Sequence, residues 1–152
     1  MALSKCIVMK FCISIIFVIV SMAFAGCGAT QAESAIDCIQ QLQEGHGFDL
    51  TSCSRIVFLP ETGCAGCISS GLKYLLEHKQ ELFEMNYIFV FVDVLDQKKL
   101  RNKIGSDIFN SERIYFVEGC WRGQALTRPL EVAIINGKPS EIDVWSPERS
   151  PD

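Results

Sequence analysis

Residues 55–67 read RIVFLPETGCAGC, an apolar run that passes directly into a pair of cysteines. The β-branched and aromatic residues predict a buried strand, which Pro60 ends because proline cannot donate to a sheet ladder. Beyond the turn at 61–63, apolar residues recur at helical spacing and predict a helix over about 64–83. The members of this apolar face are Ile68, Leu72, Leu75, Leu76, Leu82 and Phe83. The cysteine pair is therefore expected where a strand turns into a helix.

A second apolar run downstream completes a strand–helix–strand unit. Residues 87–92 read YIFVFV, and a run without polar alternation is typical of a parallel strand with helices on both of its faces. Two such strands joined by a helix are expected to be parallel, with a right-handed crossover. Asp96 is a suitable N-cap for a helix that continues to about Ile104 and that Gly105 ends. Residues 114–117 predict either a further strand or a packed loop.

The C-terminal part of the chain predicts a β-hairpin. Residues 130–135, which read LEVAII, alternate imperfectly between apolar and polar after Pro129, and Asn136-Gly137 is the strongest short-range hairpin signal in the sequence. Residues 141–145 are expected to return as the second arm. Parallel strands and helices followed by an antiparallel hairpin predict an α/β fold with a central mixed sheet in three layers.

The CAGC motif at residues 64–67 is the feature that points to chemistry. Unpaired N–H groups and the positive end of the helix dipole favour an anion at a helix start, so the thiolate of Cys64 is expected to be stabilised. We therefore expect Cys64 to attack a disulfide and Cys67 to resolve the mixed disulfide that forms. Two other interpretations are a static structural disulfide and a zinc site completed by Cys53 and His78.

The N-terminal residues predict export and attachment to a membrane. Residues 1–26 have a positive start, an apolar run and small residues at the end, as a signal peptide does. The letters FAGC, which end in Cys27, resemble the lipobox of bacterial lipoproteins and imply a lipid on Cys27; an ordinary signal peptide is the alternative. Residues 27–33 are then a tether and 34–152 the folded domain, with a first helix over about 32–43. The expected location is the cell envelope, facing the periplasm or the exterior.

These features together resemble the thioredoxin-like superfamily over about residues 53–145. The resemblance rests on the strand before the cysteine motif at 64–67, on the strand at 89–93, and on Arg128-Pro129 ahead of the hairpin. It implies a thioredoxin-like fold and thiol–disulfide oxidoreductase activity. The Gly-Cys-x-Gly-Cys form in a lipid-anchored chain is most similar to bacterial thioredoxin-like lipoproteins.

The resemblance also implies roles for the residues that open the hairpin. In the thioredoxin-like family, the proline at this position is cis and packs against the cysteine pair, and the residue before it offers backbone hydrogen bonds to the substrate. In this sequence the matching residues are Pro129 and Arg128. Asp93 and Pro129 are farther apart than in a minimal thioredoxin, which implies an insertion at about 110–126 that covers the site or binds a partner.

Three further cysteines remain in the domain. Cys38, Cys53 and Cys120 form an odd set, so we expect one structural pair, with Cys38 and Cys53 as the candidates, and one free thiol. Cys120 is interpreted either as an ordinary buried thiol or as a relay that passes a disulfide to Cys64.

Length and composition exclude other classes of function. The chain has 152 residues, which suits one domain, and 49% of them are hydrophobic, which is enough for a core. Acidic residues outnumber basic ones, 18 to 14, so nucleic-acid binding, which needs a basic face, is not expected. The sequence has no phosphate-binding loop and no nucleophile elbow, and we expect neither a cofactor nor a metal.

The sequence thus predicts an extracytoplasmic thiol–disulfide oxidoreductase. Its partners are expected to be protein or small-molecule thiols and disulfides, a redox donor, and a membrane reached through the lipid anchor. Reduction, oxidation and isomerisation are all compatible with the pair of Cys64 and Cys67, because the direction depends on its reduction potential. The alternative function is a non-catalytic thioredoxin-fold binding lipoprotein in which the two cysteines form a structural disulfide.

Overall fold

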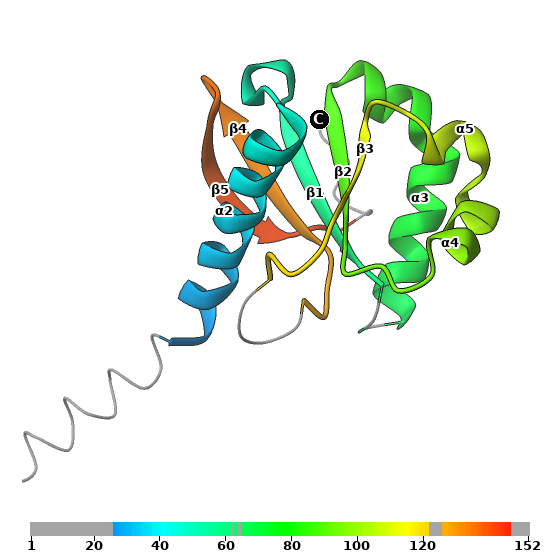
Figure 1. Cartoon of the computed structure of the whole chain (residues 1–152), viewed down its shortest axis with the longest axis horizontal. Helices are drawn as coiled ribbons and strands as arrows, with labels where there is room; N and C mark the ends of the chain where they lie inside the picture. Colours follow the sequence, from blue (N-terminus) through cyan, green and yellow to red (C-terminus); the bar gives the residue numbers. More distant parts are fainter. Residues whose placement is uncertain (1–25, 62, 64, 122–125, 147–152) are drawn as a thin grey trace, which may run out of the picture.

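A mixed five-stranded sheet forms the centre of the fold, with its strands in the order β3-β2-β1-β4-β5 (Figure 1). The computed structural model describes residues 26–61, 63, 65–121 and 126–146. The strands are β1 (Arg55–Pro60), β2 (Tyr87–Val92), β3 (Ile114–Val117), β4 (Leu130–Ile135) and β5 (Lys138–Val144). β1, β2 and β3 run parallel, whereas β4 pairs antiparallel with both β1 and β5. The α/β class, the mixed sheet and the C-terminal hairpin are confirmed.

Helices cover both faces of the sheet because the side chains of β1 and β2 alternate between two hydrophobic clusters. The helices are α2 (Gly26–His46), η1 (Leu50–Ser52), α3 (Ala65–Glu84), α4 (Gln97–Ile104) and α5 (Ser106–Phe109). Ile56 and Phe58 point to the cluster that includes the inner face of α2. Val57 and Leu59 point to the cluster with α3, α4 and α5. Figure 1 shows the resulting layers, with α2 on one side of the strands and α3 and α4 on the other.

The predicted capping residues bound α4. The carboxylate of Asp96 accepts a hydrogen bond from the backbone N–H of Lys99 at 2.8 Å, as an N-cap does. Gly105 follows the helix with a φ of 86°, a conformation that glycine adopts without the steric cost of a side chain. The predicted strands at 55–59 and 87–92 and the long helix after the cysteine motif are also confirmed.

α2 is longer than the helix predicted over 32–43. Its inner face is fully or almost fully buried and consists of Ala35, Cys38, Ile39 and Leu42. The helix begins at Gly26, so residues 27–33, which were expected to form a tether, are helical. Within the part of the chain that the structure describes, no helix is long and apolar enough to cross a membrane.

Trp145 attaches the end of the hairpin to α3. Its ring lies 5.9 Å, centroid to centroid, from Tyr74 and from Phe89, edge-on to both. A Cβ atom on Gly71 would come within 2.8 Å of the Trp145 ring, so the indole occupies the space that a side chain at this position of α3 would need. The backbone N–H of Trp145 donates to the carbonyl oxygen of Pro129 at 3.0 Å, which holds the start of β4 beside the end of β5.

Candidate functional site

The loops that follow β1, β2 and β3 lie together at the carboxyl ends of these parallel strands. The three strands are parallel, and their last residues, Pro60, Val92 and Val117, lie opposite one another in the register. The carboxylate of Glu61, after β1, accepts a hydrogen bond from the backbone N–H of Leu95, after β2. This hydrogen bond joins the loops after β1 and β2 at the carboxyl ends of the strands. Open α/β sheets bind their ligands at this end.

A second hydrogen bond joins the loop after β3 to the loop after β2. The Asp93 carboxylate, which follows β2, accepts from the backbone N–H of Gly119 at 2.8 Å. The side-chain amide of Gln41, on α2, donates to the carbonyl oxygen of Glu118 at 3.3 Å. The segment expected as an insertion at 110–126 therefore contributes a strand, β3, and a loop that joins the sheet edge to α2.

Cys67 lies in the first turn of α3, the helix that follows the carboxyl end of β1. It is the third residue of the helix, its side chain is half-buried, and it is disulfide-bonded. The first four N–H groups of a helix have no partner within it and point toward the segment before Ala65. Cys64, the predicted nucleophile, lies outside the described residues.

Gly63 brings the cysteine motif against the segment that opens the hairpin. A Cβ atom built on Gly63 would lie 2.5 Å from the carbonyl oxygen of Thr127 and 2.8 Å from its Cα. The φ of Gly63 is 138°, which also favours glycine. Thr127 directly precedes Arg128 and Pro129, so the two segments that the resemblance links do come together. The contact between Gly63 and Thr127 was not predicted from the sequence. The signal that could have indicated it is the glycine directly before Cys64, because glycine permits close approach of another backbone.

Arg128 and Pro129 differ in exposure. Arg128 is exposed, whereas Pro129 is fully buried. No peptide bond among the described residues is cis, so the Arg128–Pro129 bond is trans and the expectation of a cis proline is wrong. The trans form is the default for a proline by about 0.5–1 kcal/mol, and here the Pro129 carbonyl is used in the hydrogen bond from Trp145.

A disulfide joins Cys38 of α2 to Cys120 in the loop after β3. The two Cα atoms are 5.0 Å apart, and 82 residues separate the cysteines in sequence. The expected pairing of Cys38 with Cys53 is therefore wrong, as are both interpretations of Cys120 as a thiol. The cause lies in the topology: β3 forms the edge of the sheet that α2 covers, so its following loop reaches the inner face of α2.

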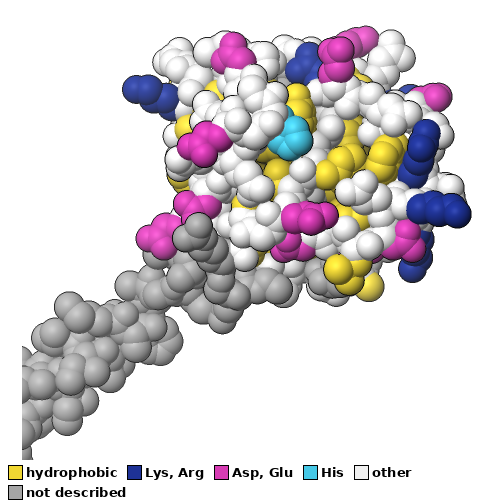
Figure 2. All heavy atoms as spheres, viewed as in Figure 1, with side chains coloured by type: hydrophobic (Ala, Val, Ile, Leu, Met, Phe, Trp, Pro, Cys, Tyr) yellow, Lys and Arg dark blue, Asp and Glu magenta, His cyan; other side chains and the backbone are white. Residues whose placement is uncertain are grey.

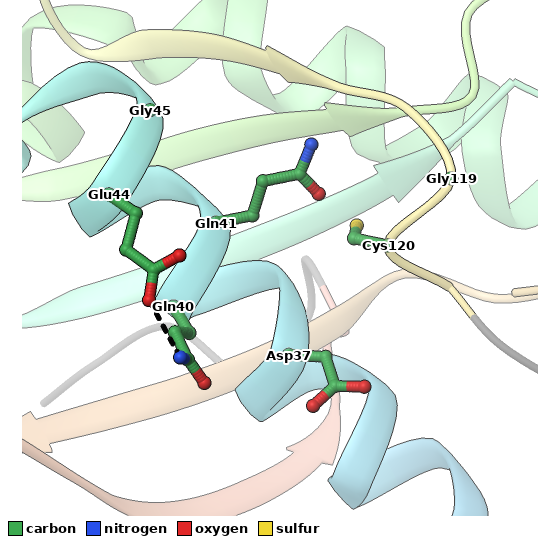
Figure 3. A pocket seen from close by; sticks show the side chains of 7 residues that line it. All are labelled: Asp37, Gln40, Gln41, Glu44, Gly45, Gly119 and Cys120. Carbon is green, nitrogen blue, oxygen red and sulfur yellow. Dashed lines mark hydrogen bonds between the residues drawn. The ribbon is translucent and has the colours of Figure 1, made fainter.

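A polar pocket of about 490 Å³ opens beside this disulfide. Figure 3 shows its two walls, one made by α2 and the other by the loop that contains Gly119 and Cys120. The lining residues are Asp37, Gln40, Gln41, Glu44, Gly45, Gly119 and Cys120. The Gln40 amide donates to the Glu44 carboxylate at 2.7 Å, along the helix surface. Because Cys120 is disulfide-bonded, this pocket contains no nucleophilic thiol among its lining residues.

Cys53 is a free thiol with low reactivity. It is buried, and its Sγ donates to the carbonyl oxygen of Leu50 at 3.5 Å. Burial raises the pKa of Cys53 to about 11; the positive charge of Arg113 lowers it and the negative charge of Asp49 raises it to smaller extents. Cys53 forms no disulfide, and no cluster of three or more potential metal ligands occurs in the described parts of the chain.

We expect folded protein to protect Cys53 from iodoacetamide at about pH 8. Only a thiolate reacts, and with a pKa of about 11 roughly one thiol in a thousand is ionised at this pH. Mass spectrometry of the peptide that contains Cys53, after timed alkylation, measures the rate. The urea-unfolded protein is the control and should react rapidly; equal rates in the folded and unfolded protein would contradict the prediction.

The same pKa predicts a loss of stability at alkaline pH. The folded protein keeps the proton on Cys53 up to about pH 11, whereas the unfolded chain releases it near an ordinary pKa of about 8.5. The contribution of this group to the free energy of unfolding is therefore complete below about pH 8.5 and decreases as the pH rises to about 11. Urea unfolding at several pH values checks this, and Cys53→Ala should show a smaller decrease over that range.

The candidate site consists of a disulfide-bonded cysteine at a helix start, a glycine that contacts the segment before β4, and an exposed arginine before a buried proline. Comparisons with protein-family models, with curated proteins and with solved structures found no match to this chain.

Proposed function

We propose that this protein is an extracytoplasmic thiol–disulfide oxidoreductase in which Cys64 and Cys67 form the redox pair. The observation that carries the proposal is the disulfide-bonded state of Cys67 in the first turn of α3, directly after the buried strand β1. Two intervening residues bring paired cysteines within the Cα separation that a disulfide requires, so Cys64 is the partner that the motif favours. A pair at a helix start is suited to exchange because its outer thiol is acidic.

The fold proposed with this function is thioredoxin-like. β1, α3 and β2 form a parallel strand–helix–strand unit, and the antiparallel hairpin of β4 and β5 extends the sheet from the other side of β1. This arrangement supports the assignment, with β3 and its following loop as an addition at the edge. The contact of Gly63 with Thr127 supports it as well, because it joins the cysteine motif to the start of the hairpin.

The proposed exchange needs only two thiols and a disulfide. The Cys64 thiolate attacks one sulfur of a substrate disulfide, whose S–S bond breaks and releases the first substrate thiolate. The Cys67 thiolate then attacks the Cys64 sulfur of the mixed disulfide and releases the second. The substrate gains two electrons and the protein becomes the disulfide, which a thiol donor must reduce before the next cycle. The reverse sequence oxidises a substrate dithiol.

Arg128 and Pro129 are the proposed substrate-binding residues. Arg128 is exposed and follows Thr127, which contacts Gly63 beside the motif. The burial of Pro129 supports a positioning role for the proline, and the exposure of Arg128 supports its contact with an extended substrate. Substrates are proposed to be proteins or small molecules that contain accessible thiols or disulfides.

The reduction potential of the pair is the test of this function. We expect the protein to equilibrate with dithiothreitol or glutathione buffers, and Cys64 to be alkylated with a pKa below the ordinary value of about 8.5. The Cys64→Ser/Cys67→Ser variant is the matched control for both measurements. An ordinary pKa without turnover of 2-hydroxyethyl disulfide would contradict the proposal and favour the alternative, a binding lipoprotein with a structural disulfide.

Membrane attachment through Cys27 is proposed from the sequence and is tested separately. We expect Cys27→Ala to abolish labelling by palmitate and to release the protein from membranes, because the lipid chains supply about 0.8 kcal/mol of membrane affinity per buried methylene. Thiol–disulfide exchange should be unchanged. Fractionation of cells and labelled-palmitate incorporation measure the two effects, with Cys53→Ala as the control. Equal labelling of the wild type and the Cys27 variant would exclude the lipid anchor.

A further inference from the structure

A small apolar pocket lies beside Cys67, on the face of the sheet that α3 and α4 cover. Its volume is about 150 Å³. The apolar part of its lining consists of Pro60, Ile68, Leu72, Phe91, Val94 and Leu100, and the polar part of Glu61, Lys99 and Lys103. Pro60 and Glu61 stand four and three residues before Cys64, and Ile68 directly follows Cys67. The pocket is therefore lined by residues from both sides of the cysteine motif, and its lining includes neither Arg128 nor Pro129.

The size and lining of this pocket suit one apolar side chain. A cavity of about 150 Å³ with apolar walls is large enough for a benzene molecule, so a leucine or phenylalanine side chain matches its volume. Leu95, the sequence neighbour of the lining residue Val94, is an apolar side chain that is 87% exposed. An apolar side chain that leaves water for such a site contributes about 25 cal/mol per Å² of area buried.

Two lysines give one side of the pocket a positive charge. Lys99 and Lys103 are four residues apart on α4, so their side chains lie on the same face of the helix. α4 contains four basic residues and no acidic one, although the whole chain has a net charge of −4. Both lysines line the pocket, and neither belongs to the ion pairs found among the described residues. In Figure 2, Lys and Arg side chains gather along the right-hand side, where Figure 1 shows α4 and α5.

Glu61 adds a negative charge to the lining of the pocket. It stands in the loop after β1, and its carboxylate accepts the hydrogen bond from the Leu95 N–H. An acidic group on a bound chain is repelled by this carboxylate and attracted to the ammonium groups of Lys99 and Lys103. The lining therefore combines apolar side chains with one carboxylate from the loop after β1 and two ammonium groups from α4.

We propose that this pocket docks a polypeptide substrate by one leucine- or phenylalanine-sized side chain followed by an acidic residue. The apolar side chain occupies the pocket, and the acidic residue contacts Lys99 and Lys103. The proposal rests on the proposed function, since it names the class of protein whose cysteine the redox pair meets. It adds a second specificity site on α4, separate from the one at Arg128 and Pro129.

Binding is tested with peptides that carry no thiol, so that the redox pair has no part in it. The probe is a fluorescent Gly/Ser peptide in which one serine takes the place of the substrate cysteine and is followed by a leucine and then a glutamate. Fluorescence anisotropy measures Kd for this peptide and for two relatives in which leucine is replaced by serine or glutamate by lysine. We expect each replacement to weaken binding about tenfold.

Charge reversal of the protein provides the matched comparison. Lys99→Glu/Lys103→Glu should weaken binding of the glutamate peptide about tenfold and strengthen binding of the lysine peptide. The control is Lys79→Glu/Lys98→Glu, which makes the same change of net charge at exposed lysines that do not line the pocket. The control should leave both Kd values within about twofold. Equal losses in the two double variants, or equal binding of all three peptides, would overturn the proposal.

The cysteine forms of the same peptides separate this inference from the redox function. Each is supplied as a mixed disulfide with 2-mercaptoethanol, and its rate of reduction by the reduced protein is compared with that of 2-hydroxyethyl disulfide, which is small and uncharged. We expect the variant Lys99→Glu/Lys103→Glu to be about tenfold slower only on the glutamate peptide. If the wild-type protein does not reduce 2-hydroxyethyl disulfide, the redox function is refuted. The anisotropy measurements still decide the docking proposal in that case.

Discussion

Protein purified with Cys67→Ser should carry a partner in a mixed disulfide on Cys64, whereas Cys64→Ser should carry almost none. Cys67 lies in the first turn of α3 and is disulfide-bonded, so in the proposed function its thiol is the one that resolves the intermediate. Without that thiol, the bond between Cys64 and a substrate has no fast intramolecular exit. Cys64, which precedes the first residue of α3 in the sequence, is expected to be the more acidic thiol and therefore the one that attacks.

The measurement is a comparison of reducible adducts after an acid quench of whole cells. Non-reducing gels of the two single variants are run beside the Cys64→Ser/Cys67→Ser variant, which should show no adduct at this motif. Equal capture by both single variants would reverse or remove the assigned roles. No capture by either would favour the structural disulfide.

Removal of the Cys38–Cys120 disulfide should cost about 4 kcal/mol of the free energy of unfolding. The bond closes a loop between cysteines 82 residues apart, and the loss of chain entropy in the unfolded state increases with the length of such a loop. Both cysteines are almost fully buried, so alanine at each position also removes packing beneath α2. Urea unfolding of Cys38→Ala/Cys120→Ala against the wild type measures the difference.

The control for this variant is Cys53→Ala, which removes a buried cysteine that has no disulfide. We expect its loss to be about 1 kcal/mol, the order of one small core truncation. A loss in the double variant no larger than in Cys53→Ala would show that the bond does not constrain the unfolded chain. Reaction with 2-hydroxyethyl disulfide should persist in the folded double variant, because Cys120 has no part in the proposed exchange.

The secondary structure near the cysteine motif could be predicted from the sequence because its signals are local. The apolar run at 55–59, the cap at Asp96 and the Asn136-Gly137 turn each determine a few neighbouring residues. Asn136 and Gly137 have φ values of 54° and 70°, the positive angles that this type of hairpin turn requires. These predictions needed no knowledge of which elements pack together.

The pairing of the cysteines could not be predicted in the same way. The partner of Cys38 depends on the position of β3 at the edge of the sheet, and residues 114–117 were compatible with either a strand or a packed loop. The contact of Gly63 with Thr127 likewise depends on how the hairpin closes against β1. Long-range neighbours of this kind are set by sheet order, which short periodic patterns do not encode.

The pocket under α4 illustrates the same limit for the site. Lys99 and Lys103 carry no motif, and a lysine pair on a helix is ordinarily a solvated face. Their significance comes from the apolar residues of three other elements that lie beneath them: Pro60, Ile68 and Phe91. A sequence shows the charges of α4, but it does not show which surface they border.

The Cys38–Cys120 bond closes a ring that leaves out the C-terminal hairpin. Both cysteines precede residue 130, so the ring that encloses β1, β2 and β3 can close before the hairpin of β4 and β5 joins the sheet. At that stage one edge of β1 has no partner strand, although β1 lies in the middle of the finished sheet. Open strand edges recruit other chains and cause aggregation. The hairpin of β4 and β5 therefore covers the open edge of β1, and a chain truncated before residue 130 leaves that edge without a partner strand.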